Sequence, residues 1–433
     1  MSPLTVGIIG IAVLVLLLAF RMSIGLSMGL VGLLGLIYLR GWNQGLEMSQ
    51  LVPYRTAAAY TMSTIPLFVV MGNFAFYSGI SKDLYSATHK WLGNLPGGLA
   101  MATTAGCAGF AAICGSSVAT AVTMGTVSLP EMKRYKYDSA LATGCIAAGG
   151  TLGILIPPSI GFIFYSMLTS ESIGKLFIAG ILPGILLAIL FMIAIYIVTR
   201  LDPMLGPPGP RTTFIEKIAV LKGMWPVLIL FLIVIGGMYL GVFTPTEAAG
   251  VGAFVAFVIM IAKKGLNRKN ITDSLLDTGK MVAMCYLIIL GATIFSYFIA
   301  FTRIPTELAE FVSGLPVPSL VIFAFIIVIY LFLGCIMDPI SMIILTVPIF
   351  YPMTKALGFD PIWFGVIIVI TMEMGMITPP VGVNVFVING VAKDVPMETT
   401  FRGMIPFLIA MVVGVVILTA FPQIATFLPG TMY

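Results

Sequence analysis

Long apolar segments recur from one end of the chain to the other, separated by short polar stretches. A helix needs about 20 apolar residues to cross a bilayer. Segments of this kind lie at residues 4–20, 24–39, 57–80, 139–168, 177–199, 225–242, 246–262, 280–300, 362–391 and 404–428. The pattern predicts an all-α polytopic membrane protein.

Two further apolar stretches carry polar residues in their middle. Residues 98–130 and 319–352 each consist of two arms around a polar centre, "CGSSVAT" and "CIMDPIS". Arms of about 12–18 residues are short for a crossing, and irregular backbone is tolerated at membrane depth only where protein or a cavity surrounds it. We therefore expect two re-entrant hairpins.

Composition strengthens this interpretation. Hydrophobic residues make up 59% of the chain and charged residues only 9%, whereas a soluble domain carries about 25% charged residues. The formal net charge of +5 comes from short basic clusters between apolar segments, such as residues 263–269. Clusters of this kind are typical of membrane-protein loops, so we expect no nucleic-acid partner.

The basic residues also predict the orientation. If the N-terminus lies outside and the ten segments cross, five of the 22 lysines and arginines lie outside and the others inside. The five outer residues are Arg40, Arg55, Lys175, Arg303 and Lys355. This bias follows the positive-inside rule and predicts that both termini lie outside.

Two crossings contain the same interruption. "GGTLGILIPPSIG" at 149–161 and "TMEMGMITPPVGV" at 371–383 each combine glycines with a proline pair. Pro157-Pro158 and Pro379-Pro380 lie 222 residues apart, and the same offset pairs Ser116 with Asp338. Five crossings separate the two units, so the second enters the membrane from the opposite side. Inverted repeats with broken helices are typical of secondary transporters.

The Pro- and Gly-rich segment after residue 200 separates the two repeats. We predict scaffold spans at 1–80 and 177–302, the latter containing a cytoplasmic linker at 201–222, and a C-terminal span at 396–433. The first repeat, 81–176, holds hairpin 98–130 and the broken helix 139–168; the second, 303–395, holds hairpin 319–352 and the broken helix 362–391.

Proline lacks an N–H donor, so each break frees backbone carbonyls that need a partner within the membrane. Neighbouring protein groups or a bound cation can supply it, and both interpretations stay open. The candidate ion ligands are Ser116, Ser117, Gly149, Gly150, Thr151 and Gly153 at the first break, and Asp338, Met374, Gly375, Met376 and Thr378 at the second. Such oxygen donors suit Na⁺ rather than a transition metal.

Four acidic or polar positions have more than one interpretation. Asp338 precedes Pro339 and also fits a helix N-cap. Ser159 and Asn384 lie beyond the proline pairs, where helix N-termini favour an anion, but they also suit hydrogen bonds between helices. Glu373 lies just before the second break, where either a proton- or ion-linked role or a paired or lumen-facing carboxylate explains it.

Several motifs are missing from the sequence. No G-x-x-x-x-G-K-[ST] motif is present, so coupling to ATP is not expected. His89 is the only histidine, and the five cysteines form no CxxC motif. An intramembrane enzyme lacks the nucleophile–base pair it would need.

Four segments together resemble the large membrane subunit (M, DctM-like) of tripartite ATP-independent periplasmic (TRAP) transporters. They are "IPLFVVMGNFAFYSGI" (65–80), "GTLGILIPPS" (150–159), "GVFTPTEAA" (241–249) and "ITPPVGVNVFV" (377–387). The resemblance implies an elevator-type fold like that of the ion-transporter superfamily. It further implies Na⁺-driven import of an organic acid, of the sialic acid or C4-dicarboxylate type, across the bacterial inner membrane, with both termini periplasmic.

The resemblance also implies two protein partners, a small four-helix membrane subunit (Q type) and a periplasmic substrate-binding protein (P type), beside membrane lipid. The substrate contacts expected with it are Ser116, Thr120, Pro158, Ser159, Asp338, Pro380, Gly382 and Asn384. A stand-alone Na⁺/organic anion symporter that needs no binding protein is the alternative.

Overall fold

The computed structural model describes residues 1–20, 22–209, 212–335 and 337–432, and every element in this part of the chain is helical. Arg21 and Arg211, which belong to the predicted inner charges, and Ile336 in the second hairpin tip lie outside the described residues.

The helices fall into two series separated by the central linker. The first series is α1 (Pro3–Ala19), α2 (Ile24–Arg40), α3 (Trp42–Ala57), the 3₁₀ turn η1 (Tyr60–Ser63), α4 (Thr64–Ser78), α5 (Ile80–Leu92), α6 (Gly98–Cys114), α7 (Ser117–Arg134), α8 (Ser139–Leu155), α9 (Ile160–Thr169) and α10 (Ile173–Leu201). The second is α11 (Phe214–Leu221), α12 (Trp225–Phe231), the π-helical η2 (Leu232–Gly236), α13 (Gly237–Tyr239), α14 (Pro245–Lys264), α15 (Arg268–Thr302), α16 (Ile304–Ser313), α17 (Ser319–Gly334), α18 (Pro339–Ala356), α19 (Pro361–Gly375), α20 (Val383–Val391), α21 (Met397–Ala420) and α22 (Gln423–Gly430).

The repeat extends over almost the whole chain. An offset of 222 residues, as between Pro157 and Pro379, carries α2 onto α14, α4 onto the second half of α15, α5 onto α16 and α10 onto α21. Packing follows the same rule, because α2 lies along α15 and α14 lies along α4. The sequence predicted the repeat only for the hairpins and the broken helices.

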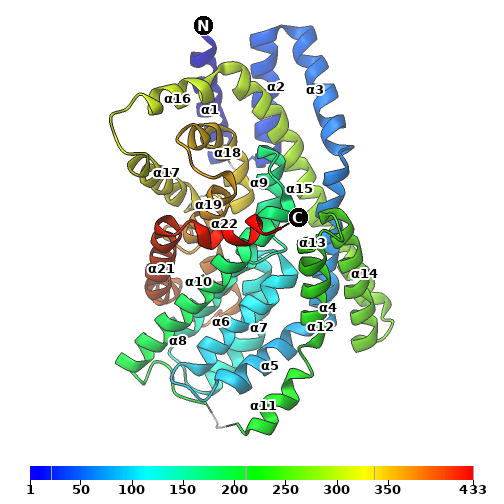
Figure 1. Ribbon diagram of the computed structural model, residues 1–433, viewed down its shortest axis with the longest axis vertical. Coiled ribbons are helices and arrows are strands. Elements are labelled where there is room, and N and C mark those ends of the chain that lie inside the picture. Colours follow the sequence, from blue (N-terminus) through cyan, green and yellow to red (C-terminus); the bar gives the residue numbers. More distant parts are fainter. Residues whose placement is uncertain (21, 210–211, 336, 433) are drawn as a thin grey trace.

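The two repeats are inverted. Figure 1 shows α6, α7 and α8 in the lower half of the molecule, and α17, α18 and α19 in the upper half. The first helices, α1 to α3, reach the upper end, whereas α11 and α12 lie toward the lower end. The predicted fold class, all-α with two hairpins and two discontinuous helices in inverted repeats, is confirmed.

The helices form two groups. The first, here called the scaffold group, contains α1 to α4 and α12 to α15, which pack mainly on one another. The second, here called the hairpin group, contains α6 to α9 and α17 to α20. Helices α10 and α21 pack on α6, α8 and α19. This packing differs from the predicted placement of residues 177–199 among the scaffold spans.

Several crossings differ from the predicted segments. In the part of the chain that the structure describes, five helices are long and apolar enough to cross a membrane by themselves, or up to eight if each bent pair counts as one span. Helix α15 has 35 residues and begins twelve residues before the predicted start at 280. The predicted last crossing, 404–428, is divided between α21 and the separate short helix α22.

Helix α3 has no counterpart among the predicted segments. Its sequence, "WNQGLEMSQLVPYRTA", mixes polar and apolar residues, and only Gly45 and Val52 are buried. Helix α3 meets the segment Tyr60–Ser78 at an angle of 54°. A search for long apolar runs misses such a helix because only a narrow stripe of it packs on protein.

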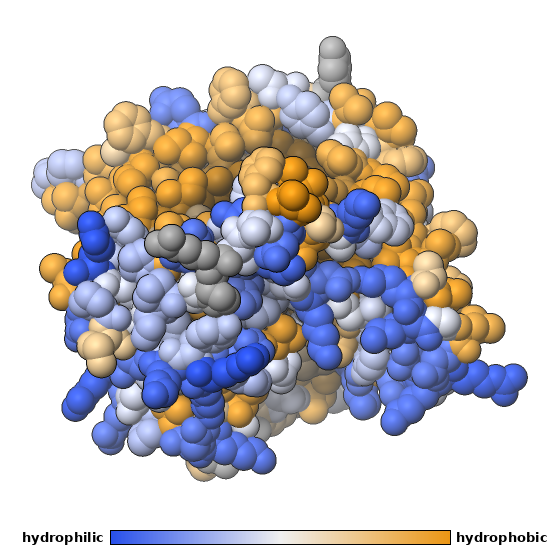
Figure 2. Space-filling model, turned by 90° about the horizontal axis from the view of Figure 1, so that it is seen from below, coloured by the Kyte–Doolittle hydropathy of each residue, from blue (hydrophilic) through white to orange (hydrophobic). Residues whose placement is uncertain are grey.

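Polar side chains gather at the lower end of the molecule. Figure 2 shows a mainly hydrophilic face there, where Figure 1 places the amphipathic helices α5 and α11. Helix α5 carries Lys82 and Lys90, and α11 carries Lys217. These three residues belong to the set predicted to face the cytoplasm.

Glycines allow the closest helix contact in the scaffold group. A Cβ atom added to Gly291 on α15 would overlap the backbone carbonyl oxygen of Gly25 on α2. Small residues promote helix association in membranes because they let two backbones approach. The contact between α2 and α15 therefore depends on glycine at both places.

We expect Gly291→Ala to destabilise the protein by about 1–3 kcal/mol, because the backbone of α2 has to move away. Gly279→Ala is the matched control on the same helix, since nothing lies within 4 Å of its added Cβ atom. Alanine there should be neutral or stabilising by up to about 1 kcal/mol. Thermal unfolding of the purified variants measures the difference, and equal midpoints would contradict this account of the contact.

Candidate functional site

The first break lies between α8 and α9, which meet at an angle of 40°. Helix α8 begins at the N-cap Asp138, whose carboxylate accepts hydrogen bonds from two backbone N–H groups. The carbonyls of Gly153 and Ile154 would need donors at Pro157 and Pro158, which have none. Within the described residues, no loop or side-chain donor reaches either carbonyl oxygen. Both proline-pair peptide bonds of the chain are cis.

The tip of the first hairpin is seated on this break. Ser116 caps α7, and its hydroxyl oxygen accepts a hydrogen bond from the backbone N–H of Ala119. A Cβ atom added to Gly153 would meet the Ser116 carbonyl oxygen and, at 2.7 Å, the Thr120 hydroxyl oxygen. Gly150 lies equally close to the Ser117 carbonyl oxygen, 3.0 Å from its added Cβ atom. The structure thus brings these predicted residues together.

Two other predicted ligands of the first break point elsewhere. Gly149 packs on the Cys107 thiol of α6, not on the hairpin tip. The Thr151 hydroxyl donates a hydrogen bond of 2.5 Å to the Ala148 carbonyl oxygen within α8. Their placement is a consequence of helix rotation, because residues separated by less than a turn face different neighbours.

The second break, between α19 and α20, satisfies its own backbone. The Thr378 hydroxyl donates to the Met374 carbonyl oxygen at 2.6 Å, and the Thr378 N–H donates to the Gly375 carbonyl oxygen at 3.1 Å. The backbone N–H of Asn384 donates to the Met376 carbonyl oxygen, also at 3.1 Å. Of the two interpretations that the sequence left open, mutual satisfaction by protein groups describes this break.

Asp338 is the N-cap of α18. Its carboxylate accepts hydrogen bonds from the backbone N–H of Ser341, at 3.1 Å, and from the Ser341 hydroxyl. The side chain is half-buried and lies near Cys285 of the scaffold helix α15, on which α18 packs. The contact with the second break comes instead from Gly334, whose backbone packs against Gly375.

The second half of each broken helix packs on helices of the other repeat. Helix α9 packs on α18 and α19, while α20 packs on α7 and α8. The Asn384 side-chain amide donates to the Ala147 carbonyl oxygen of α8 at 3.5 Å, and Ser159 caps α9 through the N–H of Phe162. Both predicted substrate contacts are therefore fully buried where helices of the two repeats meet.

The two breaks differ in exposure. Residues 151–160, including Pro158, are all buried, and α10 covers them. At the second break Pro379, Pro380 and Val381 are exposed. Gly382 adopts a left-handed conformation (φ 57°) beside Phe401 at the start of α20. Equivalent sequences thus occupy unlike surroundings.

Some buried oxygen atoms have no hydrogen-bond partner among the described residues. They are the hydroxyls of Ser27, Tyr85, Thr120 and Thr400, the Asn384 side-chain carbonyl and both carboxylate oxygens of Glu373. Thr120 and Asn384 were predicted site residues, whereas the sequence left the role of Glu373 open. Only the tertiary structure shows that this carboxyl group is sealed inside the protein, 1% exposed.

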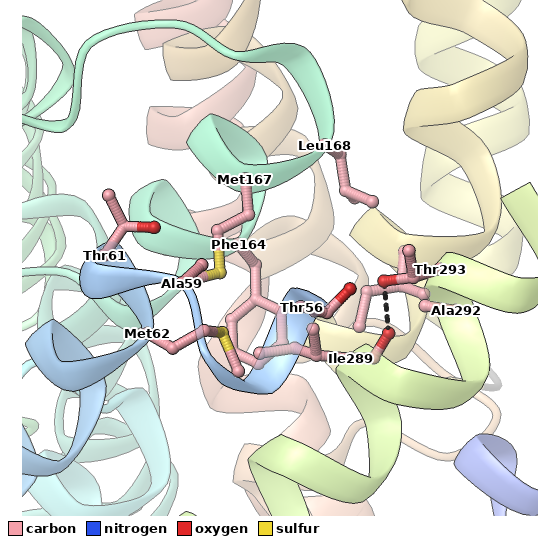
Figure 3. Close-up of a pocket in the computed structure, with 11 residues that line it drawn as sticks. Thr56, Ala59, Thr61, Met62, Phe164, Met167, Leu168, Ile289, Ala292 and Thr293 are labelled. Carbon is pink, nitrogen blue, oxygen red and sulfur yellow. Dashed lines mark hydrogen bonds between the residues drawn. The ribbon is translucent and has the colours of Figure 1, made fainter. Parts of the chain in front are cut away.

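A cavity of about 220 Å³ separates the scaffold group from the hairpin group. Figure 3 shows Thr56, Thr61 and Met62 on one side of it, facing Phe164 and Met167 of α9. Helix α15 closes the cavity with Ile289, Ala292 and Thr293. The Thr293 hydroxyl donates to the Ile289 carbonyl oxygen at 2.7 Å, a bond drawn dashed in Figure 3.

A second cavity, of about 320 Å³, lies between α4, α5, α7 and α14. Its lining is polar and basic, with Lys82, Lys263 and Lys264 opposite Thr123 and Thr126 of α7. Lys263 forms an ion pair with Asp83, which leaves two lysine side chains without this partner. Thr123 is three residues from Thr120, so hydroxyl groups line α7 from this cavity toward the hairpin tip.

Comparison with known proteins shows which family has this architecture. Residues 11–424 match the family described as "Tripartite ATP-independent periplasmic transporter, DctM component". The chain belongs to the DctM family. Members of this family are transporter components and not enzymes, so the broken helices and hairpins are parts of a transport apparatus.

Relatives in the family span nearly the same length. The C4-dicarboxylate TRAP transporter large permease protein DctM of Pseudomonas aeruginosa is 38% identical over 87% of this chain and 88% of its own. The sialic acid TRAP transporter large permease protein SiaM of Vibrio cholerae is 30% identical over 86% of each chain. The fold is similar to the YdaH transporter of Alcanivorax borkumensis, with a TM-score of 0.58, 14% identity and coverage of 89% and 90%.

Asp338 caps α18 and is also a candidate Na⁺ ligand in this DctM-family chain, and its capping role can be tested separately. Asp338→Ala removes the cap and should destabilise the protein by about 1 kcal/mol, whereas Asp338→Asn keeps the cap and should cost a few tenths at most. Thermal unfolding in Na⁺-free buffer checks both values. A large loss with Asp338→Asn would show that the charge itself, and not the cap, holds the tip together.

Proposed function

We propose that this chain is the translocating subunit of a Na⁺-driven importer of organic acids in the bacterial inner membrane. Its substrate reaches it from a periplasmic binding protein, and a small membrane subunit completes the assembly. The family description, with its words tripartite, ATP-independent and periplasmic, supports this arrangement. The relatives named for C4-dicarboxylates and sialic acid support an organic acid as substrate.

The seating of the first hairpin tip on the first break is the observation that carries the proposal. The carbonyl oxygens of Gly153 and Ile154, which lack described donors, lie at this break, where the Thr120 hydroxyl and the carbonyl oxygens of Ser116 and Ser117 come close to α8. Oxygen donors of this kind suit Na⁺. The orphaned Thr120 hydroxyl supports a missing ligand at this place. The residues fit a Na⁺ ion better here than at the second break, where the carbonyls are already occupied.

Unequal surroundings of equivalent segments support alternating access. Inverted repeats can exchange their conformations, and the exchange opens the opposite side of the membrane. Here the first break is buried and the second is partly exposed. The cavities between the scaffold group and the hairpin group supply a boundary along which the hairpin group could slide as an elevator. Both termini are expected to be periplasmic in this arrangement.

The lysine-lined cavity supports an anionic substrate. Lys82 and Lys264 would attract a carboxylate, and Thr123 and Thr126 would donate hydrogen bonds to it. Because this cavity lies beside the lower, hydrophilic end of the molecule, we place the exit for the substrate there.

Uptake into liposomes tests the proposal. We expect accumulation of a labelled C4-dicarboxylate or sialic acid only when an inward Na⁺ gradient, the small subunit and the cognate binding protein are all present. Uptake by this chain alone would favour the stand-alone symporter, and uptake unaffected by Na⁺ would remove the coupling ion.

Filling the cavity of Figure 3 tests its part in transport. Thr293→Trp places an indole between α15 and α9, and we expect uptake to fall about tenfold or more, equivalent to about 1.4 kcal/mol. Met284→Trp is the control on the same helix, where the side chain is 50% exposed. Na⁺-dependent thermal stabilisation should survive both changes. Normal uptake by Thr293→Trp would show that the hairpin group does not move across this boundary.

A further inference from the structure

Glu373 is a carboxyl group in an unusual place. It lies on α19 two residues before Gly375, is 1% exposed, and neither carboxylate oxygen accepts a hydrogen bond from the described residues. The hydroxyl of Ser117, at the start of α7, faces the carboxyl group without meeting hydrogen-bond geometry. Glu373 therefore belongs to the second repeat but faces the hairpin tip of the first.

The equivalent position in the first repeat has a satisfied polar side chain. The offset of 222 residues relates Glu373 to Thr151 on α8. Thr151 is also fully buried, but its hydroxyl is satisfied by the Ala148 carbonyl oxygen. Thr151 in the first repeat thus has a hydrogen-bond partner, whereas Glu373 in the second repeat has none among the described residues.

Among the described residues, no positive side chain pairs with Glu373. Helix α19 packs on α8, α9, α10, α17, α18, α21 and α22. The uncharged titratable groups within or next to these helices are Cys145, Tyr165, Tyr196, Tyr330, Cys335 and Tyr351. Their charged residues, with the helix caps included, are Asp138, Lys175, Arg200, Asp202, Asp338, Lys355, Asp360, Glu398 and Arg402, and none of these nine pairs with Glu373.

An ionised carboxylate without a partner is expensive to bury. Its desolvation costs several kcal/mol, and a buried charge in a protein is normally paired or bound to a metal ion. The Ser117 hydroxyl, at the hairpin tip that packs on the first break, lies next to Glu373. Thr120, one turn further along α7, has a buried hydroxyl without a hydrogen-bond partner among the described residues.

We propose that Glu373 is the anionic ligand of a Na⁺ ion that binds between the first hairpin tip and α19. Ser117 supplies a neutral hydroxyl ligand from the first repeat, and Glu373 supplies the charge from the second. The ion neutralises the carboxylate and links the two repeats. This inference rests on the proposed Na⁺-driven function and adds a ligand that the repeat symmetry does not predict.

Occupancy of such a site would stabilise the hairpin group. Without Na⁺ the buried carboxyl group has no described partner, so the hairpin tip at Ser117 and helix α19 lose the ion that links them. With Na⁺ bound, the tip of the first hairpin is held against the broken helix of the second repeat. The ion would then control whether the two repeats act as one body.

Thermal unfolding of the purified chain, with choline replaced stepwise by Na⁺ at constant ionic strength, tests the site. Na⁺ should raise the wild-type midpoint with saturation. Glu373→Gln keeps the shape and removes the charge, so it should raise the midpoint in choline and lower the apparent Na⁺ affinity about tenfold or more. Glu310→Gln, on the exposed surface of α16, is the matched control and should leave both quantities unchanged.

A second variant and a second measurement keep the test decisive. Glu373→Asp retains the charge and should retain Na⁺-dependent stabilisation at lower affinity. Ser117→Ala should weaken Na⁺ binding less than Glu373→Gln. Equilibrium binding of radioactive Na⁺ to membranes containing each variant gives the same order without unfolding, should one variant be too unstable to purify.

The possible results separate the two hypotheses. If Na⁺ stabilises the wild type and Glu373→Gln with the same midpoint, the inference about Glu373 is overturned while Na⁺ coupling stands. If Na⁺ binds to neither the wild type nor any variant, the proposed coupling ion itself fails. If acidification replaces Na⁺ in stabilising the wild type, Glu373 carries a proton and the cation site is wrong.

Discussion

Backbone carbonyl oxygens that lose their helical donors inside an apolar environment need another partner, and the arrangement of this protein follows from that constraint. Each proline pair interrupts a buried helix, and each interruption lies beside a hairpin that brings polar groups. Glycines at the breaks let the hairpin backbones come close enough for these groups to act. A continuous helix at either place would remove both the need for the hairpin and the space for an ion.

The freed carbonyl oxygens have different surroundings in the two repeats. The second break turns its chain so that Thr378 and Asn384 satisfy the freed carbonyls. The first break leaves the carbonyls of Gly153 and Ile154 without described donors but covers them completely. Helices α9 and α20 each pack on the opposite repeat, so each break is in contact with helices of the other repeat. Pseudo-symmetric parts in unlike states are what alternating access between two sides of a membrane requires.

Much of the fold could be predicted from one sequence, because its strongest signals are local. Apolar length marks the spans, proline pairs mark the breaks, and Asp138 and Asp338 cap helices as their neighbours suggest. Helix α3 escaped prediction since only a narrow stripe of it is buried. The placement of α10 and α21 beside the hairpins also escaped it, because hydropathy reports that a segment is buried in an apolar environment but not which neighbours bury it.

The sequence by itself determined the class of protein, the inverted repeat and the positions of the hairpin tips and breaks. These features depend on backbone chemistry and on the spacing of proline, glycine and small polar residues. Only the tertiary structure decided which polar groups meet: Asp338 faces the scaffold helix α15, whereas Glu373 faces the tip of the other repeat. Both are acidic residues near a break in the sequence, and the difference arises from helix rotation and from contacts between repeats more than 200 residues apart.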